Sequence, residues 1–384
     1  MRRASDRERE QLHETFAALC AIESPTGDER RVADRVRSEL AAIGLESDED
    51  DAGRLVGANA GNVFARIPAN GAGGNSASIL LCAHMDTVPP LAPIEPVRVD
   101  GGWTNANEGI LGADDKAAVA VLLGVARRFG AAGALPPPVG IELLFTISEE
   151  TGLHGAKGFD IGRLQSRFGY VFDHATPIGE IVAASPTYHR IEAIVRGRAA
   201  HAGVRPEEGR SAIVAAARAI SSMELGRLDP ETTANVGTIA GGTAANVVPE
   251  RCRIEAEVRG HDSARVQAQT TSMVDALQDA VNAEECDLDV IVTTMFEGYR
   301  VAARAPELEL AERALRACGY EPKPIVSGGG ADANAFRARG FPCLNLADGT
   351  ERNHEPDERV SADALEGLFE VAIALVEQAG ETPA

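Results

Sequence analysis

The feature that most constrains the fold is a change of pattern along the chain. Up to about residue 186, short apolar runs such as residues 78–82 and 139–147 alternate with helical stretches. This alternation is typical of an α/β domain with a largely parallel core. Between residues 187 and 298 the order becomes β-α-β-β-α-β, with strands of alternating polarity, and after residue 299 the first pattern returns. The sequence therefore predicts a discontinuous α/β domain (1–186 and 299–384) that carries an inserted α+β, ferredoxin-like domain (187–298).

Size and composition fit this organisation and exclude several classes of protein. A chain of 384 residues is long enough for two domains of ordinary size. The net charge of −21, without a basic stripe, argues against a nucleic-acid partner. The N-terminus lacks an apolar signal-peptide core, and the longest apolar stretch, residues 117–126, is too short to span a bilayer. None of the six cysteines forms a C-x-x-C pair, which indicates reduced thiols. We therefore expect a cytoplasmic protein without a membrane partner.

Acidic and histidine side chains cluster in five short segments at strand ends or in loops. The segments are AHMDTV (His84, Asp86), LGADDK (Asp114, Asp115), SEETG (Glu149, Glu150), YVFD (Asp173) and ERNHEP (His354). In open α/β sheets, ligands bind beyond the carboxyl ends of the strands, so these segments can converge on one edge. Two histidines and several carboxylates suit zinc, and also cobalt or manganese. The set is large enough for two metal ions that share a bridging carboxylate, and one carboxylate remains as a general base. Asp115 is explained more simply as an acid favoured at a helix start.

Seven motifs in a fixed order carry a family resemblance. They are AHMDTV, LGADDKA, TISEETGLHGAKGFD, AAHAG, TAANVVPERCRIEAEVR, SGGGADAN and NHEP. The chain resembles the dinuclear zinc metallopeptidase superfamily of peptidase T, aminoacylase and glutamate carboxypeptidase, and it is most similar to the peptidase T-like branch. Each motif alone is a weak signal, but seven in the same order are specific. The resemblance implies a zinc-exopeptidase domain with a mixed central sheet flanked by helices, and an inserted domain that serves as lid and dimerisation domain.

The resemblance also implies two zinc ions per subunit, with cobalt or manganese as substitutes. His84 and Asp173 would bind one zinc, Glu150 and His354 would bind the other, and Asp114 would bridge the two.

Catalytic and substrate-binding roles follow from the same resemblance. Asp86 would fix the ring of His84, and Glu149 would be the general base that takes a proton from a metal-bridging water. His201 would reach the active site of the partner subunit and stabilise the oxyanion, which implies a homodimer through the inserted domain.

The substrate would be held by residues on the inserted domain and on the glycine loop. Asn246 and Arg259 match positions that hold substrate, and the planar fork of Arg259 suits a free α-carboxylate. Arg259 could instead pair with Glu257 or Asp262. Gly329 and Gly330 match a segment that lines the substrate cleft, where small residues let backbone groups approach.

These observations predict a metal-dependent exopeptidase that hydrolyses small peptides, as a tripeptide or dipeptide aminopeptidase. An N-acyl-amino-acid or carbamoyl amidohydrolase would use the same metals and base and differ only in its pocket. A non-catalytic binding protein of the same fold is a third hypothesis, but the residues expected as metal ligands and as general base are all present, which disfavours it.

Overall fold

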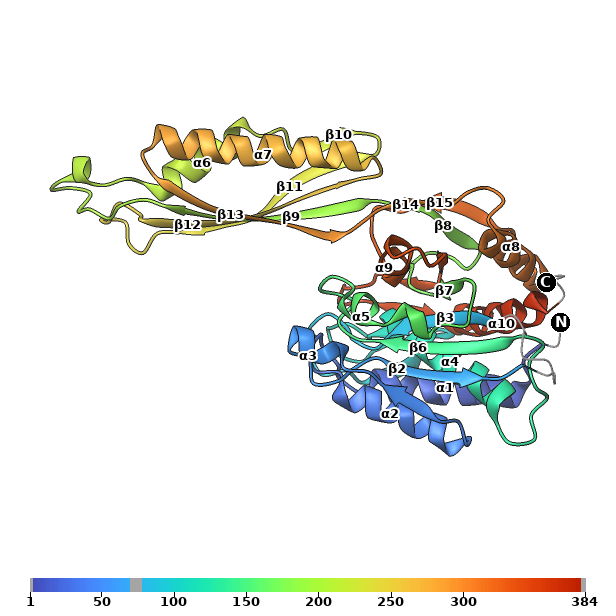
Figure 1. The fold of residues 1–384 in the computed structure, drawn as a ribbon. Coiled ribbons are helices and arrows are strands. Elements are labelled where there is room, and N and C mark those ends of the chain that lie inside the picture. The colour runs from blue at the N-terminus through green and yellow to red at the C-terminus, as the bar shows by residue number, and fades with distance from the viewer. Residues whose placement is uncertain (1–2, 70–77, 381–384) are drawn as a thin grey trace. The chain divides into compact units, whose positions relative to one another are not determined.

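The computed structural model describes residues 3–69 and 78–380 (Figure 1). Contacts between Cα atoms divide the chain into two compact units. Unit 1 consists of Met1–Ala183, Arg300–Val326 and Ala331–Ala384, and unit 2 of Ala184–Tyr299 and Ser327–Gly330. The predicted inserted segment, residues 187–298, lies within unit 2. Unit 2 is longer by three residues at its start and by one at its end, and it also includes the glycine loop.

Within the described residues, unit 1 is organised around a nine-stranded mixed sheet. The strands follow the order β1-β2-β6-β3-β7-β16-β8-β14, and β15 pairs with β8. The four central strands β6, β3, β7 and β16 are parallel, because they alternate with helices along the chain. The bounds of the nine strands are β1 (Ser47–Glu49), β2 (Val63–Ile67), β6 (Gly140–Thr146), β3 (Ser78–His84), β7 (Gly169–Val171), β16 (Cys343–Leu346), β8 (Glu180–Ser185), β14 (Tyr299–Arg300) and β15 (Lys323–Val326). The mixed sheet with a parallel core confirms the predicted fold class.

Helix α4 (Ala113–Gly130) is the central helix of unit 1, and it packs against β3 and against two other long helices. Residues 117–126 of α4 are fully buried. A Cβ at Gly124 would lie 2.8 Å from the ring of Phe369 on α10, so glycine is what permits this close approach. The helices of unit 1 are α1 (Asp6–Cys20), α2 (Arg30–Ala42), α3 (Ala52–Val56), α4, α5 (His154–Gly158), η1 (Ile161–Arg163), α8 (Pro306–Cys318), α9 (Asp332–Ala338) and α10 (Ala362–Ala379). Among the described helices, none is long and apolar enough to cross a membrane.

A small sheet in unit 1 brings the C-terminal loop region beside the segment that precedes α4. Its order is β17-β18-β5-β4, with β4 (Pro96–Val99), β5 (Gly102–Asn105), β17 (Thr350–Glu351) and β18 (Arg359–Ser361). Because β18 pairs with β5, residues between β17 and β18 are held at a fixed place in unit 1.

Unit 2 is a five-stranded antiparallel sheet with two helices packed on one face. The sheet order is β10-β11-β12-β9-β13. The predicted β-α-β-β-α-β order is present as β9-α6-β11-β12-α7-β13, and the short strand β10 is an additional element that the sequence did not reveal. The inward residues of β12 alternate with outward ones, so Cys252, Ile254 and Val258 join the apolar core under the helices. The bounds are β9 (Thr187–Arg196), η2 (Pro206–Glu208), α6 (Ala212–Ser222), β10 (Gly226–Asp229), β11 (Thr232–Gly241), β12 (Arg251–Gly260), α7 (Ser263–Ala283) and β13 (Asp287–Phe296).

Candidate active site

The candidate active site lies in unit 1, at the edge where its parallel strands end. His84 is the last residue of β3, and Glu149 and Glu150 follow the end of β6. Asp173 lies two residues beyond β7, and His354 lies in the loop between β17 and β18. The carboxyl ends of neighbouring parallel strands meet at one edge, so segments far apart in the sequence converge there. The structure brings together seven predicted residues: His84, Asp86, Asp114, Glu149, Glu150, Asp173 and His354.

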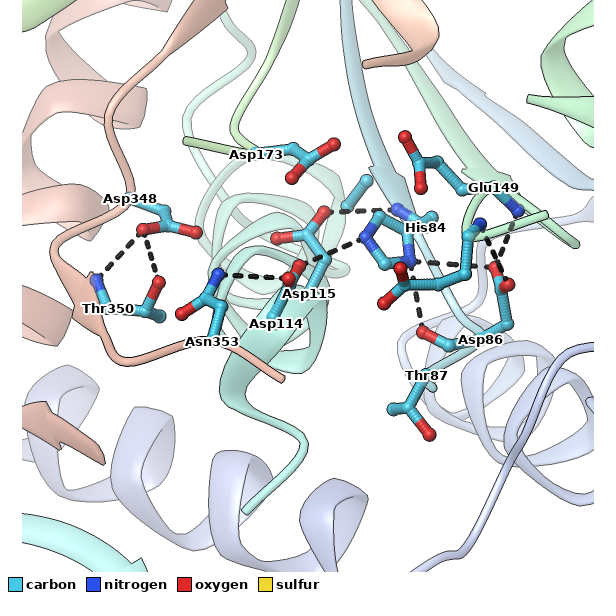
Figure 2. A network of polar contacts seen from close by, with 12 residues as sticks. His84, Asp86, Thr87, Asp114, Asp115, Glu149, Asp173, Asp348, Thr350 and Asn353 are labelled. Carbon is cyan, nitrogen blue, oxygen red and sulfur yellow. Dashed lines mark hydrogen bonds and ion pairs between the residues drawn. The ribbon is translucent and has the colours of Figure 1, made fainter. Parts of the chain in front are cut away.

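Asp114 lies between the two histidines of the site. One carboxylate oxygen, Oδ1, is 3.1 Å from His84 Nε2, and the other, Oδ2, is 3.2 Å from His354 Nε2. His354 Nε2 is also 3.1 Å from Glu150. Figure 2 shows the contact of Asp114 with His84 and a further one with Asn353. A carboxylate whose two oxygens face different imidazoles has the arrangement needed for a ligand shared between two sites.

Two groups of side chains have ligand atoms close enough to hold a metal ion. One group is His84, Glu149 and Asp173, and the other is His84, Asp114 and Glu150; the ligand atoms within each group lie within 4.8 Å of one another. All these donors are nitrogen or oxygen atoms, which suits zinc and similar divalent cations. The grouping differs from the predicted division in two respects. Glu149, predicted as the base, is grouped with His84 and Asp173 as a ligand would be, and the second group contains His84 in place of the predicted ligand His354.

The electrostatics of the site also fit a cation. Burial and the negative charge of Asp173 raise the pKa of Glu149 well above its usual range. Burial and the charge of Asp114 likewise raise the pKa of Asp173. Hydrogen bonds with Asp114 and Glu150 raise the pKa of His354 to about 10. Carboxylates outnumber the two imidazoles in this buried region, and a divalent cation would offset their mutual repulsion.

Asp86 organises the turn that carries both glutamates. Its side chain is fully buried, and its carboxylate accepts the backbone N–H of Glu149 (Oδ1, 2.9 Å) and of Glu150 (Oδ2, 3.2 Å). The hydroxyl of Thr26 donates to Oδ2 as well, at 2.7 Å. The ring of His84 faces the same residue, with Nδ1 at 3.0 Å from the Asp86 carbonyl oxygen and at 3.5 Å from Oδ1. The Asp86 main chain, more than its carboxylate, thus orients the His84 ring.

Two residues near Asp114 were not predicted as part of the site. Asp115 lies in the first turn of α4, as predicted, but it is also fully buried and its carboxylate accepts the backbone N–H of His84 at 3.1 Å. Asn353 donates through Nδ2 to Asp114 Oδ2 at 2.9 Å (Figure 2). Both residues adjoin a predicted ligand in sequence, which is the only local signal that could have identified them.

Arg259, Gly329 and Gly330 lie in one part of unit 2. Arg259 Nη1 donates to the Gly328 carbonyl oxygen at 3.4 Å, and Ser185 Oγ donates to that of Gly329 at 2.9 Å. Gly330 has no room for a side chain, because a Cβ would lie 2.4 Å from the ring of Phe296.

The side chain of Arg259 already has partners. Its guanidinium contacts Glu257 through two hydrogen bonds of 3.2 Å and lies 4.2 Å from the ring centroid of Tyr188. The pairing with Glu257 that the sequence left open is therefore present.

His201 and Asn246 lie at the other end of unit 2. The Ala202 N–H donates to the Asn246 carbonyl oxygen at 3.0 Å, and both predicted residues are exposed. Their loops join β12 at its Arg251 end, where the N–H of Gly197 donates to Glu250. At about 3.3 Å per residue, Arg251 and Arg259 are about 26 Å apart along β12. The predicted substrate-binding residues of unit 2 and the predicted oxyanion residue His201 thus form two separate groups.

Comparison with known proteins identifies the family and confirms the resemblance inferred from the seven motifs. The family described as peptidase family M20/M25/M40 matches residues 80–378. The chain is 34% identical over 374 residues to YqjE of Bacillus subtilis (strain 168), covering 96% of this chain and 98% of that protein. Among solved structures, it is similar to the aminopeptidase PepT from Bacillus cereus ATCC 10987 (37% identity, TM-score 0.83, 97% of this chain and 98% of that chain). It is also similar to a tripeptidase from Staphylococcus aureus subsp. aureus Mu50 (32% identity, TM-score 0.88, 97% and 99%). The chain belongs to peptidase family M20/M25/M40.

Proposed function

We propose that this peptidase is a metal-dependent aminopeptidase that removes the N-terminal residue from tripeptides and dipeptides. The observation that carries the proposal is the placement of Asp114 between His84 and His354, with Glu149 close to His84. Two solved structures that are similar over almost the whole chain are named as an aminopeptidase and a tripeptidase, which supports the choice of substrate class.

The residues present fit two divalent cations, zinc with cobalt or manganese as substitutes. His84 and Asp173 would hold one ion, Glu150 and His354 the other, and Asp114 would be shared. When bound, such ions polarise a scissile carbonyl and make a water molecule more acidic.

Glu149 is the proposed general base. Glu149 is 9% exposed, and burial and the charge of Asp173 raise the pKa of its carboxyl well above the usual range, which favours the uptake of a proton. It would take a proton from the attacking water and return it to the amine of the leaving product. The two hydrogen bonds from the Glu149–Glu150 backbone to Asp86 keep the base in place.

The separation of the two substrate-binding groups in unit 2 supports a homodimer. An extended tripeptide spans roughly 10 Å, far less than the length of β12 between the groups. One tripeptide therefore cannot contact Arg259 and His201 of the same subunit. We propose that Arg259 and the glycine loop bind the C-terminal carboxylate, and that His201 and Asn246 serve the active site of a second copy of the chain. Unit 2 would then act as both lid and dimerisation domain.

We further propose that the enzyme works in the cytoplasm. The six cysteines, which all lie among the described residues, form no disulfide, and unpaired thiols are typical of proteins from reducing compartments.

The test is a matched substrate assay on the zinc- or cobalt-loaded protein. The substrates are a free tripeptide, the same tripeptide with an acetylated N-terminus, and an N-acetyl amino acid. We expect cleavage of the free tripeptide alone, with release of its N-terminal residue and loss of turnover in a chelator. A preference for either acylated substrate would assign the protein to the amidohydrolases, and a protein that purifies without metal and turns over nothing would be a binding protein.

A further inference from the structure

One side chain connects the segment that carries His354 to the loop that carries Asp114. Glu358 Oε1 accepts the backbone N–H of Asp114 at 2.9 Å. Its second oxygen, Oε2, accepts the N–H groups of Leu111 and Gly112, both at 2.8 Å. Glu358 is only 1% exposed, so these three hydrogen bonds form away from solvent, where each is costly to lose.

The backbone N–H groups of the turn that leads into α4 have no acceptor from a side-chain cap of that helix. Gly112, the residue that precedes α4, provides no side-chain cap, and Asp114 and Asp115 depart from helical backbone angles. The N–H groups at the start of a helix need acceptors from elsewhere, and a carboxylate is also favoured there by the helix dipole. Glu358 supplies that acceptor from a residue 244 positions away in the sequence.

The same segment also contacts the Asp114 side chain. Asn353 Nδ2 donates to Asp114 Oδ2 at 2.9 Å, and His354 Nε2 is 3.2 Å from the same oxygen. Residues 353–358 therefore hold Asp114 through both its backbone and its carboxylate.

We propose that Glu358 is a positioning residue of the metal centre, which sets the place of the shared ligand Asp114 relative to His354. The proposal rests on the proposed function, because it takes Asp114 and His354 as metal ligands. Glutamine at this position would preserve the shape of the side chain but replace one acceptor oxygen with an NH₂ donor. At least one of the three N–H groups would then face a donor, and the loop would shift.

A second buried glutamate offers a matched control. Glu142 on β6 is also 1% exposed, and its carboxylate accepts the backbone N–H groups of Gln165 and Ser166 at distances from 2.9 to 3.1 Å. None of the described contacts of Glu142 involves a predicted metal ligand. Glu142→Gln therefore removes a comparable structural carboxylate from the same unit.

The experiment compares the wild type with Glu358→Gln, Glu358→Asp and Glu142→Gln. Zinc affinity is measured by competition with a chromophoric chelator, the cobalt-loaded proteins are compared by visible absorption, and thermal unfolding is followed in excess chelator. We expect two zinc ions per wild-type subunit. Glu358→Gln should lose about 10–100-fold in affinity for at least one ion and change the cobalt spectrum. Glu142→Gln should be destabilised in chelator but keep wild-type affinity and spectrum.

Other results would overturn the positioning role of Glu358 or the proposed function. Wild-type affinity and spectrum in Glu358→Gln, or an equal loss of affinity in Glu142→Gln, would overturn the positioning role. If Glu358→Gln does not fold, Glu358→Asp decides, because its shorter carboxylate should still cap the loop but displace Asp114. Glu358→Asp is expected to lose affinity by a smaller factor, and wild-type values in it would overturn the role. A wild-type protein that binds no metal would instead refute the proposed function.

Discussion

The carboxylate of Asp86 accepts the backbone N–H of Glu149 at 2.9 Å, and this bond joins the end of β3 to the turn after β6. The other Asp86 oxygen accepts the N–H of Glu150. One buried side chain thus fixes the main chain of both the proposed base and a proposed metal ligand. It acts on them through the backbone, so its loss should affect catalysis and metal binding together.

Replacing Asp86 by Asn should therefore lower kcat by about 10–100-fold and weaken metal binding, because an amide group cannot accept through both ends. Steady-state kinetics and a chelator competition measure the two effects. The control is Thr26→Val, which removes only the hydroxyl that donates to Asp86 Oδ2 and should leave kcat near the wild-type value. Unchanged kcat in Asp86→Asn would contradict the interpretation.

Glu149→Gln should reduce kcat by about 10²–10⁴-fold, as expected when a general base is lost. If Glu149 is the base rather than a ligand, the variant retains two metal ions per subunit, which elemental analysis of the dialysed protein can count. Glu150→Gln is the companion variant and should lose metal. Loss of one ion in Glu149→Gln would show that its proximity to His84 and Asp173 reflects ligation.

Mixing two inactive variants tests whether His201 serves the partner's site. His201→Ala and Glu149→Gln are each expected to be nearly inactive. When they are co-expressed in equal amounts, half of the dimers are mixed, and each mixed dimer has one site with both residues intact. Activity of about a quarter of wild type is therefore expected from the symmetry of a dimer. If the co-expressed variants give no more than the sum of their separate activities, His201 acts within its own subunit or not at all.

Glu257→Gln should improve the binding of substrates with a free C-terminus, since Glu257 occupies the guanidinium of Arg259. The pair is partly exposed, so we expect at most about a five-fold decrease in KM, equivalent to roughly 1 kcal/mol. The C-terminal amide of the same peptide is the control, and its KM should not change. Equal changes for both peptides would indicate that Arg259 does not bind the carboxylate.

Glu49 provides a pH-dependent contribution to stability that does not involve the site. Its hydrogen bonds with Arg30 on α2 hold the pKa of the Glu49 carboxyl below its usual range. A carboxyl with a lowered folded-state pKa stabilises the protein above its unfolded-state pKa of about 4.3, and the contribution is lost as pH falls through the folded-state value.

Glu49→Gln should therefore lower the free energy of unfolding by about 1 kcal/mol at pH 7, and the difference from wild type should shrink below about pH 4. Urea unfolding of the metal-free proteins at both pH values measures it. Asp48→Asn removes the ion pair of a more exposed side chain with Arg163 and should have a smaller effect. A difference for Glu49→Gln that persists at low pH would contradict the assignment.

The sequence predicted that several of these polar side chains lie close together, because they directly follow buried parallel strands whose carboxyl ends meet at one edge. His84, Glu149 and Asp173 are close together in the structure for that reason. The change of pattern near residue 187 likewise indicated a second unit. The roles of His84, Glu149 and Asp173 in metal binding and catalysis stay predictions.

Other features depended on contacts between distant segments, which no local pattern encodes. The sequence predicted Asp115 only as an acid at the start of a helix, but its buried carboxylate also accepts the backbone N–H of His84. Glu358 has no sequence signal of its own, and its partners precede α4. The strand β10 was missed because it is short and has no buried residue, so it carries no apolar pattern.

The sequence by itself determined the family, the alternation of strands and helices, and the set of nitrogen and oxygen donors, because hydrophobic periodicity and motif order are properties of the chain alone. Only the tertiary structure decided that Asp114 lies between two histidines, that Asp86 holds both glutamates by their backbones, and that the loop of His201 lies near the end of β12 opposite to Arg259. These relationships depend on which strands pair and on which buried N–H groups lack a local acceptor. Both are determined by contacts between segments far apart in the sequence, which form only when the whole chain folds.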